Sequence, residues 1–160
     1  MSFLTQNMNQ RGMTPILGAV DLIPSPDTVT AQIDPASTFA YFQVTSAVKL
    51  KTGSSGAIFV DAQTGPTDAA VWGVIPLNAQ KNKYAAGAII EVLRSGYIYL
   101  RTSAAVVRGT RVAMTAATAT SDPVVQTDAT SGHFTLGIAI DEASAADQLI
   151  RVQISPLTNP

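Results

Sequence analysis

Short segments in which apolar and polar residues alternate constrain this fold more than any other feature of the sequence. Residues 134–140 and 149–154 show the pattern most clearly, each with a period of two. Successive side chains of a β-strand point to opposite faces of a sheet, so this period is typical of a strand with one buried face. The residues expected to face the interior are Phe134, Leu136, Ile138, Ile140, Ile150, Val152 and Ile154.

Two hairpins are predicted around these strands. A short loop at residues 94–96, which ends in Gly96, would join a strand over residues 88–93 to one over residues 97–102. The second hairpin would join residues 48–51 to residues 57–60, with Val48 and Leu50 facing inward and Lys49 and Lys51 facing outward. Further strands are expected over residues 39–44, 71–75, 111–115 and 124–127.

No segment has the composition of a long amphipathic helix, since glutamate occurs only at Glu91 and Glu142 and alanine is dispersed among threonine and glycine. Several short strands separated by turn residues indicate an all-β sandwich or barrel. We therefore expect a single antiparallel β-sandwich or barrel-like domain over residues 36–160.

Residues 1–35 have a different composition and are expected to form an extended N-terminal arm. Proline at this density opposes both helices and central strands, and about 30 extended residues span roughly 100 Å. We expect that removing residues 1 to about 30 leaves the β domain folded. The prolines of this segment are Pro15, Pro24, Pro26 and Pro35.

The charge content excludes several classes of partner. Only 13% of the 160 residues are charged, with a formal net charge of −1, whereas roughly 25% is usual in soluble chains. Without a basic patch, nucleic-acid binding is not expected. No apolar stretch approaches the roughly 20 residues that span a membrane, and cysteine is absent. A surface so poor in charge suits a subunit that is partly buried against other subunits.

Candidate catalytic and metal-binding residues are few. His133 is the single histidine and could meet Asp122 or Asp128, but no nucleophile elbow or oxyanion-hole motif accompanies it. The carboxylates Asp141, Glu142 and Asp147 lack the spacing of a calcium loop and are expected in a solvated loop. We therefore predict no catalytic residues, no metal, no cofactor and no small-molecule substrate.

A carbohydrate-binding β-sandwich that uses Trp72 and Tyr84 is one alternative function, because both aromatic residues are near polar residues in the sequence. Packing of both side chains in the core is the simpler interpretation.

Residues 40–156 contain a characteristic order of strands and turns. A strand opened by Gly87 is followed by a turn and a second strand over residues 96–100. A Val-x-x-Gly-x-x-Val element follows over residues 106–112, and then come a strand at residues 136–140 and a closing strand at residues 149–154. This order resembles that of the structural cement, or capsid decoration, proteins of tailed bacteriophages.

This resemblance implies a non-enzymatic virion protein that binds and stabilises the outside of an icosahedral capsid shell. It implies the major capsid protein as partner, a homotrimer, and a location on the capsid surface after assembly in the bacterial cytoplasm. A tail or baseplate component is the second alternative. The residues assigned to a partner interface are Phe3, Leu4, Met8, Met13, Ile16, Leu17, Leu22, Ile23 and Trp72.

Overall fold

The computed structural model of this chain describes residues 17–21, 26–51, 57–68, 70–78, 80–118 and 121–158. These residues form twelve β-strands and no α-helix, which confirms the all-β prediction. None of these described residues forms a helix long and apolar enough to cross a membrane.

Five strands close into a ring, and the barrel-like prediction is thereby confirmed. The ring runs in the order β8 (Ile89–Arg101), β2 (Asp27–Ile33), β5 (Phe59–Ala62), β4 (Ala47–Lys51), β6 (Gly73–Val74) and back to β8. β4 and β5 form the predicted antiparallel hairpin. β2 and β5 are parallel, whereas the other neighbouring strands of the ring are antiparallel, as the sequence predicts.

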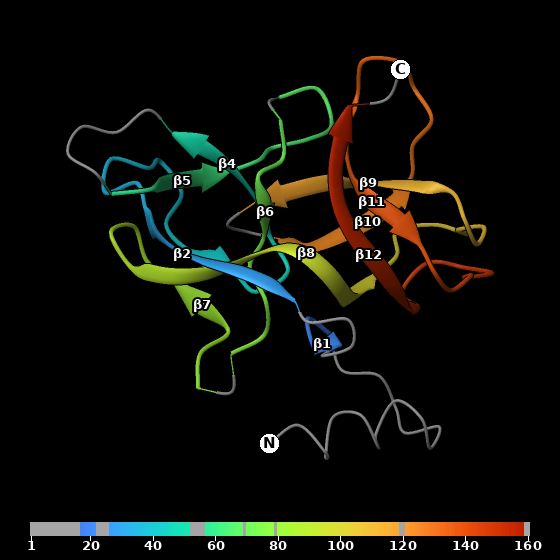
Figure 1. The fold of residues 1–160 in the computed structure, drawn as a ribbon, viewed down its shortest axis with the longest axis horizontal. Helices are drawn as coiled ribbons and strands as arrows, with labels where there is room; N and C mark the ends of the chain where they lie inside the picture. The colour runs from blue at the N-terminus through green and yellow to red at the C-terminus, as the bar shows by residue number, and fades with distance from the viewer. Residues whose placement is uncertain are drawn as a thin grey trace.

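The sheet continues from the other part of β8 into the C-terminal half of the chain. The order there is β8, β12 (Leu149–Thr158), β11 (Phe134–Ala139), β9 (Arg111–Thr118) and β10 (Ser121–Thr127). An isolated bridge from β10 returns to Thr102, directly after β8. Figure 1 shows β8 between the ring strands and this C-terminal group.

Three two-residue strands complete the fold. β1 (Val20–Asp21) pairs with β8, and β3 (Phe42–Gln43) pairs with β7 (Lys83–Tyr84).

The buried apolar side chains form two clusters, one for each part of the sheet. The first is contributed mainly by the ring strands: Ala31, Ile33, Phe42, Val48, Val60, Ala62, Ile75, Ile90 and Val92. The second is contributed mainly by β8 to β12: Ile98, Leu100, Val106, Val112, Met114, Val125, Leu136, Ala139, Ile150, Val152 and Ile154, with Ala47, Val71, Val74, Leu93 and Ala143. Because β8 supplies residues to both clusters, it joins them into one sheet system.

The predicted hairpin at residues 94–96 is wrong, because β8 runs without a turn through these residues. Ser95 pairs with Asp27 of β2, and Gly96 pairs with Ile154 of β12. Gly96 has φ +134° and passes so close to Pro26 that an added Cβ would lie 3.2 Å from the Pro26 Cβ. Gly96 thus lies where β8 changes its partner from β2 to β12 without a turn. A glycine at such a position and a glycine in a turn look the same in the sequence.

The alternating pattern predicts burial correctly in β12 and only partly elsewhere. Ile150, Val152 and Ile154 are fully buried, whereas Ile138 is 36% exposed. A register shift between Thr135 and Gly137 of β11 reverses the faces beyond it. Leu50 is also exposed, contrary to expectation.

Part of the expected arm is built into the sheet. β1 and β2 lie within residues 1–35, and β2 is a central strand between β8 and β5. Pro26 and Pro35 flank β2 instead of interrupting it, so every residue of the strand keeps its backbone N–H. Residues 1–16 and 22–25 of the expected arm lie outside the described residues.

Candidate functional site

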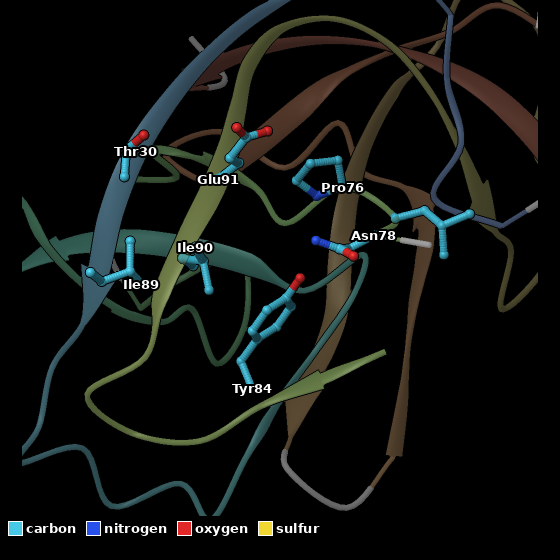
Figure 2. A pocket seen from close by; sticks show the side chains of 8 residues that line it. Thr30, Pro76, Asn78, Tyr84, Ile89, Ile90 and Glu91 are labelled. Carbon is cyan, nitrogen blue, oxygen red and sulfur yellow. The ribbon is translucent and has the colours of Figure 1, made fainter. Parts of the chain in front are cut away.

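A groove of about 280 Å³ opens on the outside of the ring, between β8 and the segment that follows β6. Figure 2 shows Glu91 and Thr30 toward one end of this groove, with the Tyr84 hydroxyl pointing toward Asn78. We call it the β8 groove and define it by its lining residues: Thr30, Pro76, Leu77, Asn78, Tyr84, Ile89, Ile90 and Glu91.

The groove exists because the pairing between β6 and β8 stops after one residue pair. Val74 pairs with Leu93, and the same antiparallel register would next bring Pro76 opposite Glu91. Proline has no N–H to donate to the ladder. The two segments therefore separate at Pro76, and the space between them is the β8 groove.

Apolar side chains are unusually exposed along this part of the surface. Ile89 of β8 is 72% exposed, Leu77 is 40% exposed and Ile58 is 39% exposed. Ile89 also lines a second depression of about 300 Å³, which it shares with Ile58 and Gln32. Ile58, Ile89 and Leu77 thus place exposed apolar side chains along the two depressions.

The described chain begins beside the β8 groove. The Gly18 N–H donates to the Tyr99 carbonyl at 2.6 Å, and the Gly18 carbonyl accepts from the Leu77 N–H at 2.9 Å. Gly18 has φ +75°, and an added Cβ would lie 3.0 Å from the Thr45 Cγ2. Gly18 is thus fixed next to Leu77, one of the residues that line the groove.

Two of the nine residues assigned to a partner interface lie in the described part of the chain. Leu17 is half-buried. Trp72 packs against the ring cluster, and the guanidinium carbon of Arg94 lies 5.1 Å from its ring centroid. The other seven residues, Phe3, Leu4, Met8, Met13, Ile16, Leu22 and Ile23, lie outside the described residues.

Trp72 and Tyr84 do not line one pocket. Tyr84 lines the β8 groove, whereas Trp72 is not among the groove residues. Both aromatic side chains pack partly against the ring cluster, as the simpler interpretation of the sequence expected.

His133 and Asp128 lie together between β10 and β11. The His133 Nδ1 is 2.8 Å from the Asp128 Oδ2, and the Thr130 N–H donates to the Asp128 Oδ1 at 2.9 Å. Burial raises the pKa of Asp128, but the hydrogen bonds from His133 and Thr130 outweigh it, so the pKa is lowered overall. Neither His133 nor Asp128 lines the β8 groove.

The carboxylates of residues 141–147 are dispersed around a loop. Asp141 pairs with the Arg151 guanidinium at 3.1 Å, and Asp147 has a positive φ of 61°. Glu142 is exposed. Among the described residues no group of three or more His, Asp or Glu side chains could hold a metal ion.

Asp68 forms a second carboxylate contact, with the Lys49 ammonium at 2.7 Å and the Thr64 N–H at 2.9 Å. Burial raises the pKa of Asp68, and the hydrogen bonds from Lys49 and Thr64 lower it by more. This pair braces the loop after β5 against β4.

Sequence reasoning did not identify Ile89 and Leu77 as surface residues. One signal was present, since Ile89 and Ile90 are adjacent apolar residues in a strand and cannot both face the same core.

Comparisons with known proteins place this chain in a family. Residues 16–155 match the family model described as structural cement protein (E217 gp24/Pam3 gp6), which confirms the resemblance seen in the sequence. Among solved structures, the chain is similar to the N base of head fiber gp8.5 in bacteriophage phi29. That similarity has 14% sequence identity and a TM-score of 0.49, and it covers 81% of this chain and 94% of the phi29 chain. No curated protein matches the sequence.

The family match extends over nearly the whole described β domain, from the segment before β1 into β12. The chain therefore belongs to the phage structural cement protein family, whose members are structural proteins of the virion associated with the capsid.

Proposed function

We propose that this protein binds the outside of an icosahedral capsid shell and stabilises it, without a catalytic step. Its partner in this proposal is the major capsid protein. It would act as a homotrimer that is added to the shell in the bacterial cytoplasm. The family match supports the capsid association, and the low charge of the chain suits extensive contact with other subunits.

The position of the contact with the shell is inferred from one observation. Arg94 is exposed and lies over the half-buried ring of Trp72 on the outside of the β domain. Tryptophan and arginine are the residue types most often found at energetically dominant positions of interfaces. We assign this pair to the shell contact.

The N-terminal residues would add a second, tethered contact. Phe3, Leu4, Met8, Met13 and Ile16 precede the point where Gly18 fixes the chain to the body. Leu17, Leu22 and Ile23 continue the same apolar series. Contacts joined on one body act at a high effective concentration, so three such segments in a trimer would raise avidity by orders of magnitude.

Stabilisation of the shell requires that each subunit contact two neighbouring capsid proteins, and the proposal includes this bridging. A subunit that binds two neighbouring capsid proteins at once must be released before they can separate. Ligands that bind only the assembled state stabilise it by mass action, so occupancy of the shell by this protein would raise the temperature at which the shell opens.

The test is to add the purified protein to shells that lack it. The proposal predicts cosedimentation with the shells and a higher shell melting temperature, and light scattering of the free protein should give the mass of a trimer. Attachment to isolated tails and not to shells would overturn the proposal in favour of a tail or baseplate component. A stable monomer that does not cosediment with either would overturn both.

A further inference from the structure

The edge of β8 that faces the β8 groove carries unpaired backbone groups. The Ile33 N–H donates to the Ala88 carbonyl at 2.9 Å, and in the same register Ala31 pairs with Ile90. Hydrogen bonds alternate along an antiparallel pair. The backbone of Ile90 therefore points to β2, and the N–H and carbonyl groups of Ile89 and Glu91 point the other way.

Those groups have no backbone partner among the described residues. On that side, β6 pairs with β8 only at Leu93, and Pro76 prevents the ladder from continuing toward Glu91. A strand edge left open in this way is a template for another extended segment. The exposed Ile89 side chain beside the edge offers an apolar contact to that segment.

We propose that the N-terminal segment of the same subunit, residues 1–16, lies in the β8 groove as an added strand against Ile89–Glu91. The segment starts in the right place, because Gly18 is hydrogen-bonded to Leu77 of the groove. Sixteen extended residues reach roughly 55 Å, and the tether keeps the segment at a high local concentration.

The charges of the segment and of the groove are complementary. Arg11 is the single charged side chain in residues 1–16. Glu91 is the single charged side chain among the groove-lining residues that the structure describes. In an antiparallel register that pairs Arg11 with Glu91, Met13 lies opposite Ile89 and offers it an apolar contact.

This inference deepens the proposed function, because the same segment is assigned to the shell contact. The groove holds the segment in the free subunit and competes with the shell for it. All the experiments below use the free protein, so their outcome does not depend on shell attachment.

Crosslinking tests where the segment lies. The chain contains no cysteine, so Ile89→Cys can be labelled uniquely with a benzophenone maleimide in the full chain. The matched control is Val107→Cys, at an apolar residue that is 66% exposed and lies outside the β8 groove. After irradiation and tryptic digestion, which cleaves after Arg11, mass spectrometry identifies the crosslinked residue.

The expected result is a crosslink from position 89 to a residue of 1–16 within a band of monomer mass, at least tenfold more abundant than from position 107. A crosslink to residues 1–16 in a band of dimer mass would overturn the proposal in favour of a segment from a second copy. Equal yields from the two labelled positions, or no crosslink to residues 1–16, would also overturn it.

Amide hydrogen exchange tests the backbone pairing independently of any label. In a variant that lacks residues 1–16, the Ile89 and Glu91 amides should exchange at least tenfold faster than in the full chain. The Ile90 amide, whose partner is Ala31, serves as the internal control and should not change. Equal exchange at Ile89 and Glu91 in the two proteins would overturn strand addition.

A charge exchange tests the pairing of Arg11 with Glu91. Arg11→Glu should reduce the crosslink yield from the labelled position 89 at least threefold, and the added substitution Glu91→Arg should restore it. If Arg11→Glu leaves the yield unchanged, Arg11 does not pair with Glu91.

Discussion

The Nδ1 atom of His133 lies 2.8 Å from the Oδ2 atom of Asp128, and the Asp128 side chain is only 5% exposed. The same carboxylate accepts the Thr130 N–H. The contact between His133, the single histidine of the chain, and the Asp128 carboxylate thus fixes the loop between β10 and β11. The same contact favours the ionised form of the buried carboxylate.

Acid should remove the stability that Asp128 supplies. The pKa of Asp128 is lowered in the folded protein, whereas an unfolded aspartate titrates near about 3.9. A group with a lowered folded pKa contributes stability above its unfolded pKa, and this contribution disappears as the pH falls through the folded pKa. The difference in unfolding free energy between wild type and Asp128→Asn should therefore be about 1–3 kcal/mol at pH 7 and should shrink below about pH 4.

Urea unfolding between pH 7 and pH 2 measures this difference. Glu142→Gln, at an exposed loop position, is the control and should change stability by less than about 0.5 kcal/mol. A difference between wild type and Asp128→Asn that does not vary with pH would show that the carboxylate contributes through packing alone.

Gly73→Ala should destabilise the ring where β6 meets β8. An added Cβ would lie 2.6 Å from the Leu93 carbonyl oxygen and 2.5 Å from the Val92 Cγ1, so the backbone of β8 would have to move. Overpacking of this kind costs about 1–3 kcal/mol. Gly65→Ala is the matched control, because nothing lies within 4 Å of its added Cβ. Equal melting temperatures for the two variants would contradict the close packing of β6 on β8.

Removal of residues 1–16 should leave the β domain folded and weaken its attachment to shells. Removal of residues 1 to about 30, which the sequence suggested would leave the β domain folded, should instead prevent folding, because it deletes β1 and most of β2. β2 pairs with both β8 and β5 and supplies Ala31 and Ile33 to the ring cluster. Circular dichroism and thermal melting compare the two truncations, and a cooperative melt of the longer one would contradict this role of β2.

Arg94→Ala should lower affinity for the shell without loss of folding, since the side chain is exposed and lies over Trp72. Truncation of a dominant interface residue costs about 2 kcal/mol or more, which is roughly a 30-fold loss of affinity. Arg108→Ala, at an exposed position in the loop before β9, is the control. Cosedimentation with shells over a range of protein concentrations gives both affinities, and equal values would remove the Trp72–Arg94 pair from the shell contact.

The class of fold and most of the strands can be predicted from the sequence alone. The period of two in residues 149–154 predicts strand β12 and its buried face correctly, because alternation follows from the geometry of a single strand. The low charge and the order of strands and turns were also sufficient to indicate the family. These features depend on local backbone geometry or on the chain as a whole, and neither requires knowledge of which strands are neighbours.

The pairing of the strands and the open edge of the sheet are visible only in the folded chain. Gly96 could serve a turn or a strand that changes partners, and the choice depends on β2 and β12, which are distant in sequence. The β8 groove likewise depends on Pro76 facing Glu91 across a gap of fifteen positions. The residues that form such a site come together only when the ring closes, because long-range strand pairing is set by the packing of both cores and not by the local pattern.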